Sequence, residues 1–218
     1  MNKTKEDILL RHSNRNYDEC FAKVVLEEYF SDRYGDLQLQ DKPDLFDRKN
    51  NIGIEVVRAV DKYKNEAMML WVKMPEKNPQ QQKRAIERMK QLGEEYQGGF
   101  QCWSSVEYPY ELSRSPLQLF VKALVKKINL LNKNQYKECD RYDLFVNSEL
   151  YIQHELLSEL FEQIKGVNNK AKKFSFVYLY GQQTIVEFDF IHNKYSVSKD
   201  EKQTELVRHA HELVYVGE

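Results

Sequence analysis

Two carboxylates in a predicted hairpin, Asp44 and Glu55, are the residues whose type and spacing best suit them to chemistry. The segment that holds them, residues 41–59, has two short apolar runs on either side of the polar turn 48–51. Apolar runs rich in Val and Ile around an Asn-containing link predict a β-hairpin. A carboxylate inside such a strand is costly to bury unless a cation compensates its charge. Two carboxylates brought together by a hairpin also repel each other, and a divalent cation removes that repulsion, so the segment predicts a metal site.

The residues PD at 43–44 and GIEVV at 53–57 resemble the core motif of the PD-(D/E)XK, or restriction-endonuclease-like, nuclease superfamily. The resemblance is strongest over residues 20–60 and extends beyond them only through the order of the elements. It implies a hairpin with Asp44 on one strand and Glu55 on the next, one or two Mg²⁺ (or Mn²⁺) ions, and hydrolysis of a phosphodiester in nucleic acid. We favour DNA over RNA as the substrate, although the sequence leaves both open. The family's lysine stands two residues after the glutamate, where this chain has Val57.

The resemblance also implies further metal ligands. The carbonyl oxygen of Val56 matches a frequent backbone ligand of the family, and a glutamate on the first helix often completes the site. Residues 17–30 are predicted to be helical, and a rotation of about 100° per residue places Glu28 in the arc of the apolar side chains. We therefore expect Glu28 to join Asp44 and Glu55 around the metal. The alternative is that Glu28 reaches water or pairs with an arginine.

A lysine from another element can replace the one that the motif lacks. Residues 115–116, Ser-Pro, begin the clearest predicted helix, with Ser at the N-cap, Pro in the first turn and an apolar stripe behind them. Lys127 lies at the margin of this stripe, where its stem can rest on apolar surface and its ammonium can reach a neighbouring site. Some members of the family carry the catalytic lysine on a nearby helix, so the resemblance nominates Lys127, with Lys126 second. An ordinary surface lysine is the alternative. Tyr136, just after the helix, can also border the site, although nothing in its spacing singles it out.

Length and composition bound these expectations. The chain has 218 residues, of which 41% are hydrophobic and 31% charged, with 5 Pro and 8 Gly, which indicates an ordered globular protein and most simply one α/β domain over residues 1–218. The net charge of −1 gives no overall basic field, although a local basic face is compatible with nucleic-acid binding. Cysteines at 20, 102 and 139 form neither a disulfide framework nor a zinc motif. The polar N-terminus and the lack of a membrane-length apolar run predict a cytoplasmic protein with no membrane partner, and a homodimer is one open option.

The rest of the chain alternates helical and extended patterns, which predicts a mixed central β-sheet flanked by helices, the fold class that the resemblance also implies. Helices are expected at 79–97, 151–164 and 201–216, strands at 37–40, 143–146, 174–180 and 184–190, and an extended aromatic segment at 100–110. Glu187 and Asp189 share one face of the segment 184–190, which predicts a half-solvated edge strand.

Two functional hypotheses follow. The first is a magnesium-dependent nuclease in which Asp44 and Glu55 hold the ion and Lys127 stabilises charge on the phosphate or orients the attacking water. The second is a catalytically inactive nuclease-like scaffold that binds nucleic acid or a protein as a regulatory module. Val57 and the near-zero net charge favour the second. The habits of the family suggest a setting in defence or in mobile elements for either. A third interpretation is an α/β protein whose acidic hairpin is merely exposed to solvent.

Overall fold

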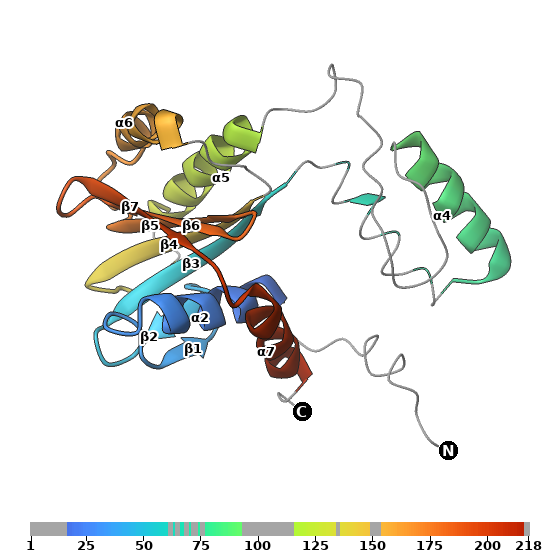
Figure 1. Ribbon diagram of the computed structural model, residues 1–218, viewed down its shortest axis with the longest axis horizontal. Coiled ribbons are helices and arrows are strands. Elements are labelled where there is room, and N and C mark those ends of the chain that lie inside the picture. Colours follow the sequence, from blue (N-terminus) through green and yellow to red (C-terminus); the bar gives the residue numbers. More distant parts are fainter. Residues whose placement is uncertain are drawn as a thin grey trace. The chain divides into compact units, whose positions relative to one another are not determined.

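The computed structural model describes residues 17–60, 63, 66–67, 70, 74, 77–92, 116–133, 136–148 and 154–215. The chain divides into two compact units, one made of residues 1–59 and 120–218 and the other of residues 60–119. The first unit holds a mixed β-sheet with helices on both faces (Figure 1), which confirms the predicted α/β class with a mixed sheet flanked by helices. A single domain over residues 1–218 stays a prediction.

The described strands form one sheet in which their spatial order follows the chain. They are β1 Leu37–Leu39, β2 Leu45–Asp47, β3 Ile52–Ala59, β4 Arg141–Ser148, β5 Phe176–Gly181, β6 Thr184–Asp189 and β7 Lys194–Lys199. Strands β3, β4 and β5 are parallel, and every other neighbouring pair is antiparallel. Parallel neighbours need a crossover connection. Helix α5, Pro116–Leu131, lies in the connection before β4, and helix α6, Leu157–Val167, in the one before β5.

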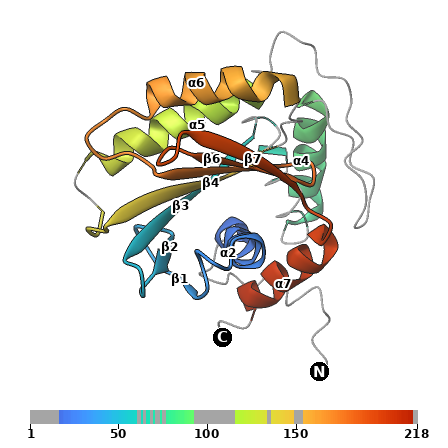
Figure 2. The same cartoon turned by 60° about the vertical axis from the view of Figure 1, so that its left-hand side comes forward.

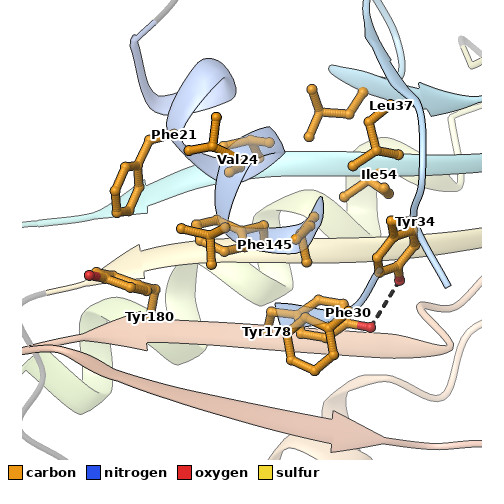
Figure 3. Packing of buried hydrophobic residues seen from close by; sticks show 14 of the residues in the cluster. Phe21, Val24, Phe30, Tyr34, Leu37, Ile54, Phe145, Tyr178 and Tyr180 are labelled. Carbon is orange, nitrogen blue, oxygen red and sulfur yellow. Dashed lines mark hydrogen bonds between the residues drawn. The ribbon is translucent and has the colours of Figure 1, made fainter. Parts of the chain in front are cut away.

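The helices cover opposite faces of this sheet. Helices α5 and α6 lie on one face, whereas α2, Tyr17–Tyr29, and α7, Gln203–Tyr215, lie on the other (Figures 1 and 2). Because side chains alternate along a strand, each strand residue faces one pair of helices or the other. Ile54 and Val56 of β3 belong to the core beneath α2 (Figure 3). Glu55, which stands between them, therefore points towards α5.

Helix α2 is buried around most of its circumference in its first three turns. Its buried residues are Cys20, Phe21, Ala22, Val24, Val25 and Leu26. Two partners account for this, because the sheet covers one side of the helix and α7 covers another. The rings of Tyr17 and His211 of α7 lie 4.6 Å apart, and Phe21 contacts Tyr180 of β5 edge to face at 4.9 Å. No helix among the described residues is both long and apolar enough to cross a membrane.

Helix α4, Pro79–Gln91, is the regular element described in the second unit. It begins at the predicted residue, because Asn78 caps it: the side chain of Asn78 accepts a hydrogen bond from the Gln81 backbone, and the Gln81 side chain accepts one from the Asn78 backbone. The helix buries Ala85 and Met89. The aromatic segment predicted at residues 100–110 lies outside the described residues.

The prediction of an edge strand at 184–190 was wrong. Strand β6 is buried, and Glu187 and Asp189 are only 7% and 2% exposed, because β7 pairs along its outer side. Arg33 compensates Glu187 at 2.9 Å, and the turn after β6 donates to Asp189. Strand β7 is mostly exposed and polar, so its sequence, KYSVSK, lacks the apolar alternation that indicates a strand.

Asp143 of β4 anchors a buried polar network on the α2 face. It is fully buried, and it accepts hydrogen bonds from the Tyr34 hydroxyl at 2.7 Å, from Arg141 Nε at 2.9 Å and from the backbone of Phe176 at 3.0 Å. The Tyr34 hydroxyl also contacts that of Tyr178, as the dashed line in Figure 3 shows. Burial raises the pKa of Asp143 to about 6, although Arg141 opposes the rise.

The Asp143→Asn substitution is expected to change how stability depends on pH. A carboxyl whose pKa is raised by folding keeps its proton more tightly in the folded state, so its contribution to stability falls as pH rises from the ordinary value of 3.8 to about 6. This fall amounts to about 3 kcal/mol. We expect urea unfolding between pH 4 and 7 to show it in the wild type, and to show a correspondingly flatter dependence in the variant. Equal pH slopes in the two proteins would contradict the prediction.

Candidate active site

The hairpin places Asp44 beside Glu55. Leu45 of β2 pairs with Ile54 of β3 in antiparallel register, so the next position along brings residue 44 opposite residue 55. Asp44 Oδ2 accepts a hydrogen bond from the backbone N–H of Val56 at 2.7 Å. This bond fixes the Asp44 carboxylate where the ladder of β2 has ended, and it satisfies a strand donor that β2 no longer reaches.

A close packing contact holds the chain just before Asp44 against β3. Gly53 shares the α5 face with Glu55, two residues further along the strand. A Cβ atom at residue 53 would lie 2.8 Å from Cγ of Pro43 and 3.0 Å from Sγ of Cys139. A larger residue at this position would therefore push Pro43 away and displace the carboxylate that follows it.

Helix α5 brings a cation to both carboxylates. Lys127 Nζ lies 2.6 Å from Glu55 Oε2 and 3.1 Å from Asp44 Oδ2. The side chains of Lys127 and Glu55 are only 15% and 2% exposed, so this contact is largely shielded from water. The second sequence candidate, Lys126, is exposed and donates to neither carboxylate. The charge that the motif lacks at Val57 thus comes from α5.

Tyr136 is a site residue that the sequence did not single out. Its hydroxyl donates to Glu55 Oε2 at 3.0 Å. It lies in the irregular segment between α5 and β4, where no periodicity indicates which way a side chain points. Burial and the neighbouring Glu55 raise the pKa of Tyr136, so its hydroxyl keeps the proton that it donates.

The charges of the site are strongly coupled. Burial raises the pKa of Glu55, and Asp44 raises it further, whereas Lys127 and Tyr136 oppose both. Burial lowers the pKa of Lys127, but Glu55 and Asp44 outweigh it, and the net effect is a rise. Lys127 therefore stays an ammonium at neutral pH and compensates the two carboxylates.

Each carboxylate uses one oxygen for protein donors, and its other oxygen receives no hydrogen bond from the described residues. Glu55 Oε1 is buried and has no hydrogen-bond partner. Asp44 Oδ1 receives no hydrogen bond from the described residues, because its donors, Val56 and Lys127, both bind Oδ2. The N–H and C=O of one strand residue point to the same side, so the Val56 carbonyl also lies towards Asp44. Mg²⁺ takes carboxylate and carbonyl oxygens as ligands, so the chemical type of these oxygens suits it.

The structure does not bring Glu28 to this pair, which corrects the expectation of a third acidic ligand. Glu28 is exposed and pairs with Lys202, the residue just before α7. Helix α2 covers the face of the sheet opposite to the one that carries Glu55 and Lys127. Helical rotation places Glu28 on the same side of α2 as part of its apolar arc. That arc packs against α7 and against the sheet face that does not carry Glu55, so Glu28 does not reach the pair. The neighbouring Glu27 pairs with Lys23 on the same helix.

Asp44 and Glu55 therefore form a pair of acids. No group of three or more His, Cys, Asp and Glu side chains is arranged to hold a metal ion in the described part of the chain. Comparison of the chain with models of known protein families, with curated proteins and with solved structures found no match.

Proposed function

We propose that the hairpin and α5 form the active site of a magnesium-dependent nuclease with a restriction-endonuclease-like fold. The observation that carries the proposal is the buried, unpartnered Oε1 of Glu55, which lies beside a second carboxylate and a charged lysine. An unpaired carboxylate oxygen in a buried position is costly, and a divalent cation would satisfy it. The resemblance of residues 43–57 to the family motif supports the same assignment, and Lys127 supplies the charge for which Val57 offers none.

The residues have separable roles in this proposal. Asp44 and Glu55 would hold the ion through Oδ1 and Oε1, the oxygens that receive no protein hydrogen bond, together with the carbonyl of Val56. When bound, the ion polarises the scissile phosphate and lowers the pKa of an attacking water. Lys127, fixed by Glu55, donates to the phosphate oxygens on which charge develops. Tyr136 keeps Oε2 of Glu55 occupied and so directs Oε1 to the ion.

The Asp44→Ala substitution tests the proposal. We expect added Mg²⁺ or Mn²⁺ to raise the melting temperature of the wild type, through a stabilisation of about 2.7 kcal/mol at an ion concentration 100 times Kd. We also expect the wild type to cut plasmid or oligonucleotide substrates. The variant should lose both responses because it removes an open oxygen. Asp36→Ala, which changes an exposed acid outside the site, serves as the control and should behave like the wild type. Wild-type cleavage by Asp44→Ala would refute the assignment.

A second candidate function is a nuclease-like scaffold that binds nucleic acid without cutting it. One observation favours it: the ammonium of Lys127 already compensates both carboxylates, so the pair is stable without a metal ion. The same experiment separates the two candidates. Binding of nucleic acid without any melting response to Mg²⁺ or Mn²⁺, and without cleavage, would favour the scaffold.

A further inference from the structure

Two segments of this chain, one of which contains α5, carry lysines and no acidic residue. Residues 116–137 contain lysines at 122, 126, 127, 133 and 137 and no Asp or Glu, and residues 168–174 contain lysines at 170, 172 and 173 and no Asp or Glu. The whole chain, by contrast, balances 33 basic residues against 34 acidic ones. Two acid-free segments in a nearly neutral chain produce a local positive field wherever they come together.

The fold does bring the two segments together. Lys170 Nζ donates to the side-chain oxygen of Asn129 on α5 at 2.5 Å. Asn132, just after α5, donates to the carbonyl of Lys172 at 2.8 Å and accepts from its backbone N–H at 3.0 Å. These bonds hold residues 170–172 against the last turn of the helix, so the charges of both segments lie at one place.

Four of these lysines form a row along the exposed side of α5, which we call the lysine row: Lys122, Lys126, Lys170 and Lys133. Lys122 and Lys126 are four residues apart and share one side of the helix, about 6 Å from each other along its axis. Lys133 lies two residues beyond the end of α5, where its backbone N–H donates to the carbonyl of Leu130. Lys170 lies between Lys126 and Lys133, because Asn129 holds its ammonium there. All four side chains are exposed.

The spacing of the row selects the kind of partner. A single small anion would engage one or two of these ammonium groups, whereas a polymer with a phosphate at every residue can engage all of them. Helix α6 lies beside α5 (Figure 2) and carries exposed acids, among them Glu159 and the Lys165-paired Glu162. Lys127, one residue from Lys126, turns from the row into the candidate active site.

We infer that the lysine row binds the sugar–phosphate backbone of a nucleic acid along the helix that supplies Lys127 to the Asp44–Glu55 pair, an inference that rests on the proposed function for the identity of the polymer. The row contacts phosphates and carries no sequence preference, since ammonium groups on phosphates position a strand without reading its bases. The row and the metal pair thus have separate tasks, which are to retain the strand and to act on it.

The double variant Lys126→Gln/Lys133→Gln tests the row on the full chain. Its control is Lys194→Gln/Lys199→Gln, which removes the same charge from exposed lysines of β7. Binding of a fluorescent DNA duplex is measured in EDTA over a series of salt concentrations. The row variant should bind about tenfold more weakly, or worse, at low salt, and the slope of log K against log salt should fall by about 1 for each lysine. The control should keep the wild-type slope.

Equal slopes in the two double variants would overturn the inference, and so would a wild type that binds anionic lipid vesicles but no oligonucleotide. Failure of the proposed function looks different. If the row variant shows its reduced slope but the wild type never cuts nucleic acid, the inference about the lysine row is supported and the nuclease proposal is refuted. If the wild type cuts with Mg²⁺ and the row variant binds and cuts as the wild type does, the nuclease proposal is supported and the inference about the row is refuted.

Discussion

Replacing Lys127 with methionine is expected to lower the free energy of unfolding by about 3 kcal/mol or more at pH 7 in EDTA. The substitution keeps most of the apolar stem but removes the charge that contacts both Glu55 and Asp44. Glu55 is 2% exposed, so its carboxylate would be left buried beside a second carboxylate without a compensating cation. Urea unfolding of the two proteins in EDTA measures the loss.

The loss should depend on pH. Without Lys127 the pKa of Glu55 rises further, because burial and Asp44 both raise it and the largest opposing contribution is gone. A carboxyl with a raised pKa in the folded state holds its proton more tightly there, so its effect on stability is most favourable in acid and worsens as pH rises above its ordinary value of 4.5. We therefore expect the gap between Lys127→Met and the wild type to narrow below about pH 5.

A divalent ion should rescue part of this loss, because it would take over the compensation of the two carboxylates. The melting temperature of Lys127→Met is expected to rise with Mg²⁺ at least as much as that of the wild type. Cleavage is expected to be absent, because the variant lacks the ammonium that stabilises charge on the phosphate. Lys126→Met changes the exposed neighbour and should alter stability by no more than about 0.5 kcal/mol. A Lys127→Met protein as stable as the wild type at pH 7 would show that the ammonium compensates nothing.

The sequence predicted the elements of the site because their signals are local. The hairpin of β2 and β3 is confirmed, since apolar alternation and a polar turn define it within a few residues. Helix α5 is confirmed as well, because Pro116 and a continuous apolar stripe mark its start and its buried side. The position of Lys127 at the margin of that stripe, together with a family resemblance that called for a lysine from another element, pointed to Lys127 as the residue that could reach the hairpin.

The sequence did not show which face of the sheet each helix covers. Alternation in β3 separates Glu55 from Ile54 and Val56, but it does not say which helix lies over which set. For this reason the helical rotation of Glu28 led to a wrong position, on the α2 face and paired with Lys202. Tyr136 was named only as a residue that could border the site and was given no role, because a residue in an irregular segment carries no periodic signal.

Replacing Glu55 with glutamine is expected to abolish the response to metal while leaving the fold in place. The amide has nearly the same shape, and its oxygen can still accept from Lys127 and Tyr136. Its NH₂ group, however, would take the place of Oε1, which now has no hydrogen-bond partner, and it presents hydrogen-bond donors in place of lone pairs. We expect no rise in melting temperature with Mg²⁺, and cleavage slower by about 10³-fold, which corresponds to about 4 kcal/mol of lost stabilisation.

The matched control for this change is Glu27→Gln, which alters a half-buried, lysine-paired carboxylate on the α2 face. Glu27 and Glu55 lose the same charge to the same amide, so any shared effect on stability cancels in the comparison. A melting response to Mg²⁺ that survives in Glu55→Gln as fully as in Glu27→Gln would mean that the ion binds elsewhere. The buried Oε1 of Glu55 would then need a different explanation, because the ligand assignment depends on its being the oxygen of Glu55 to which neither Lys127 nor Tyr136 donates.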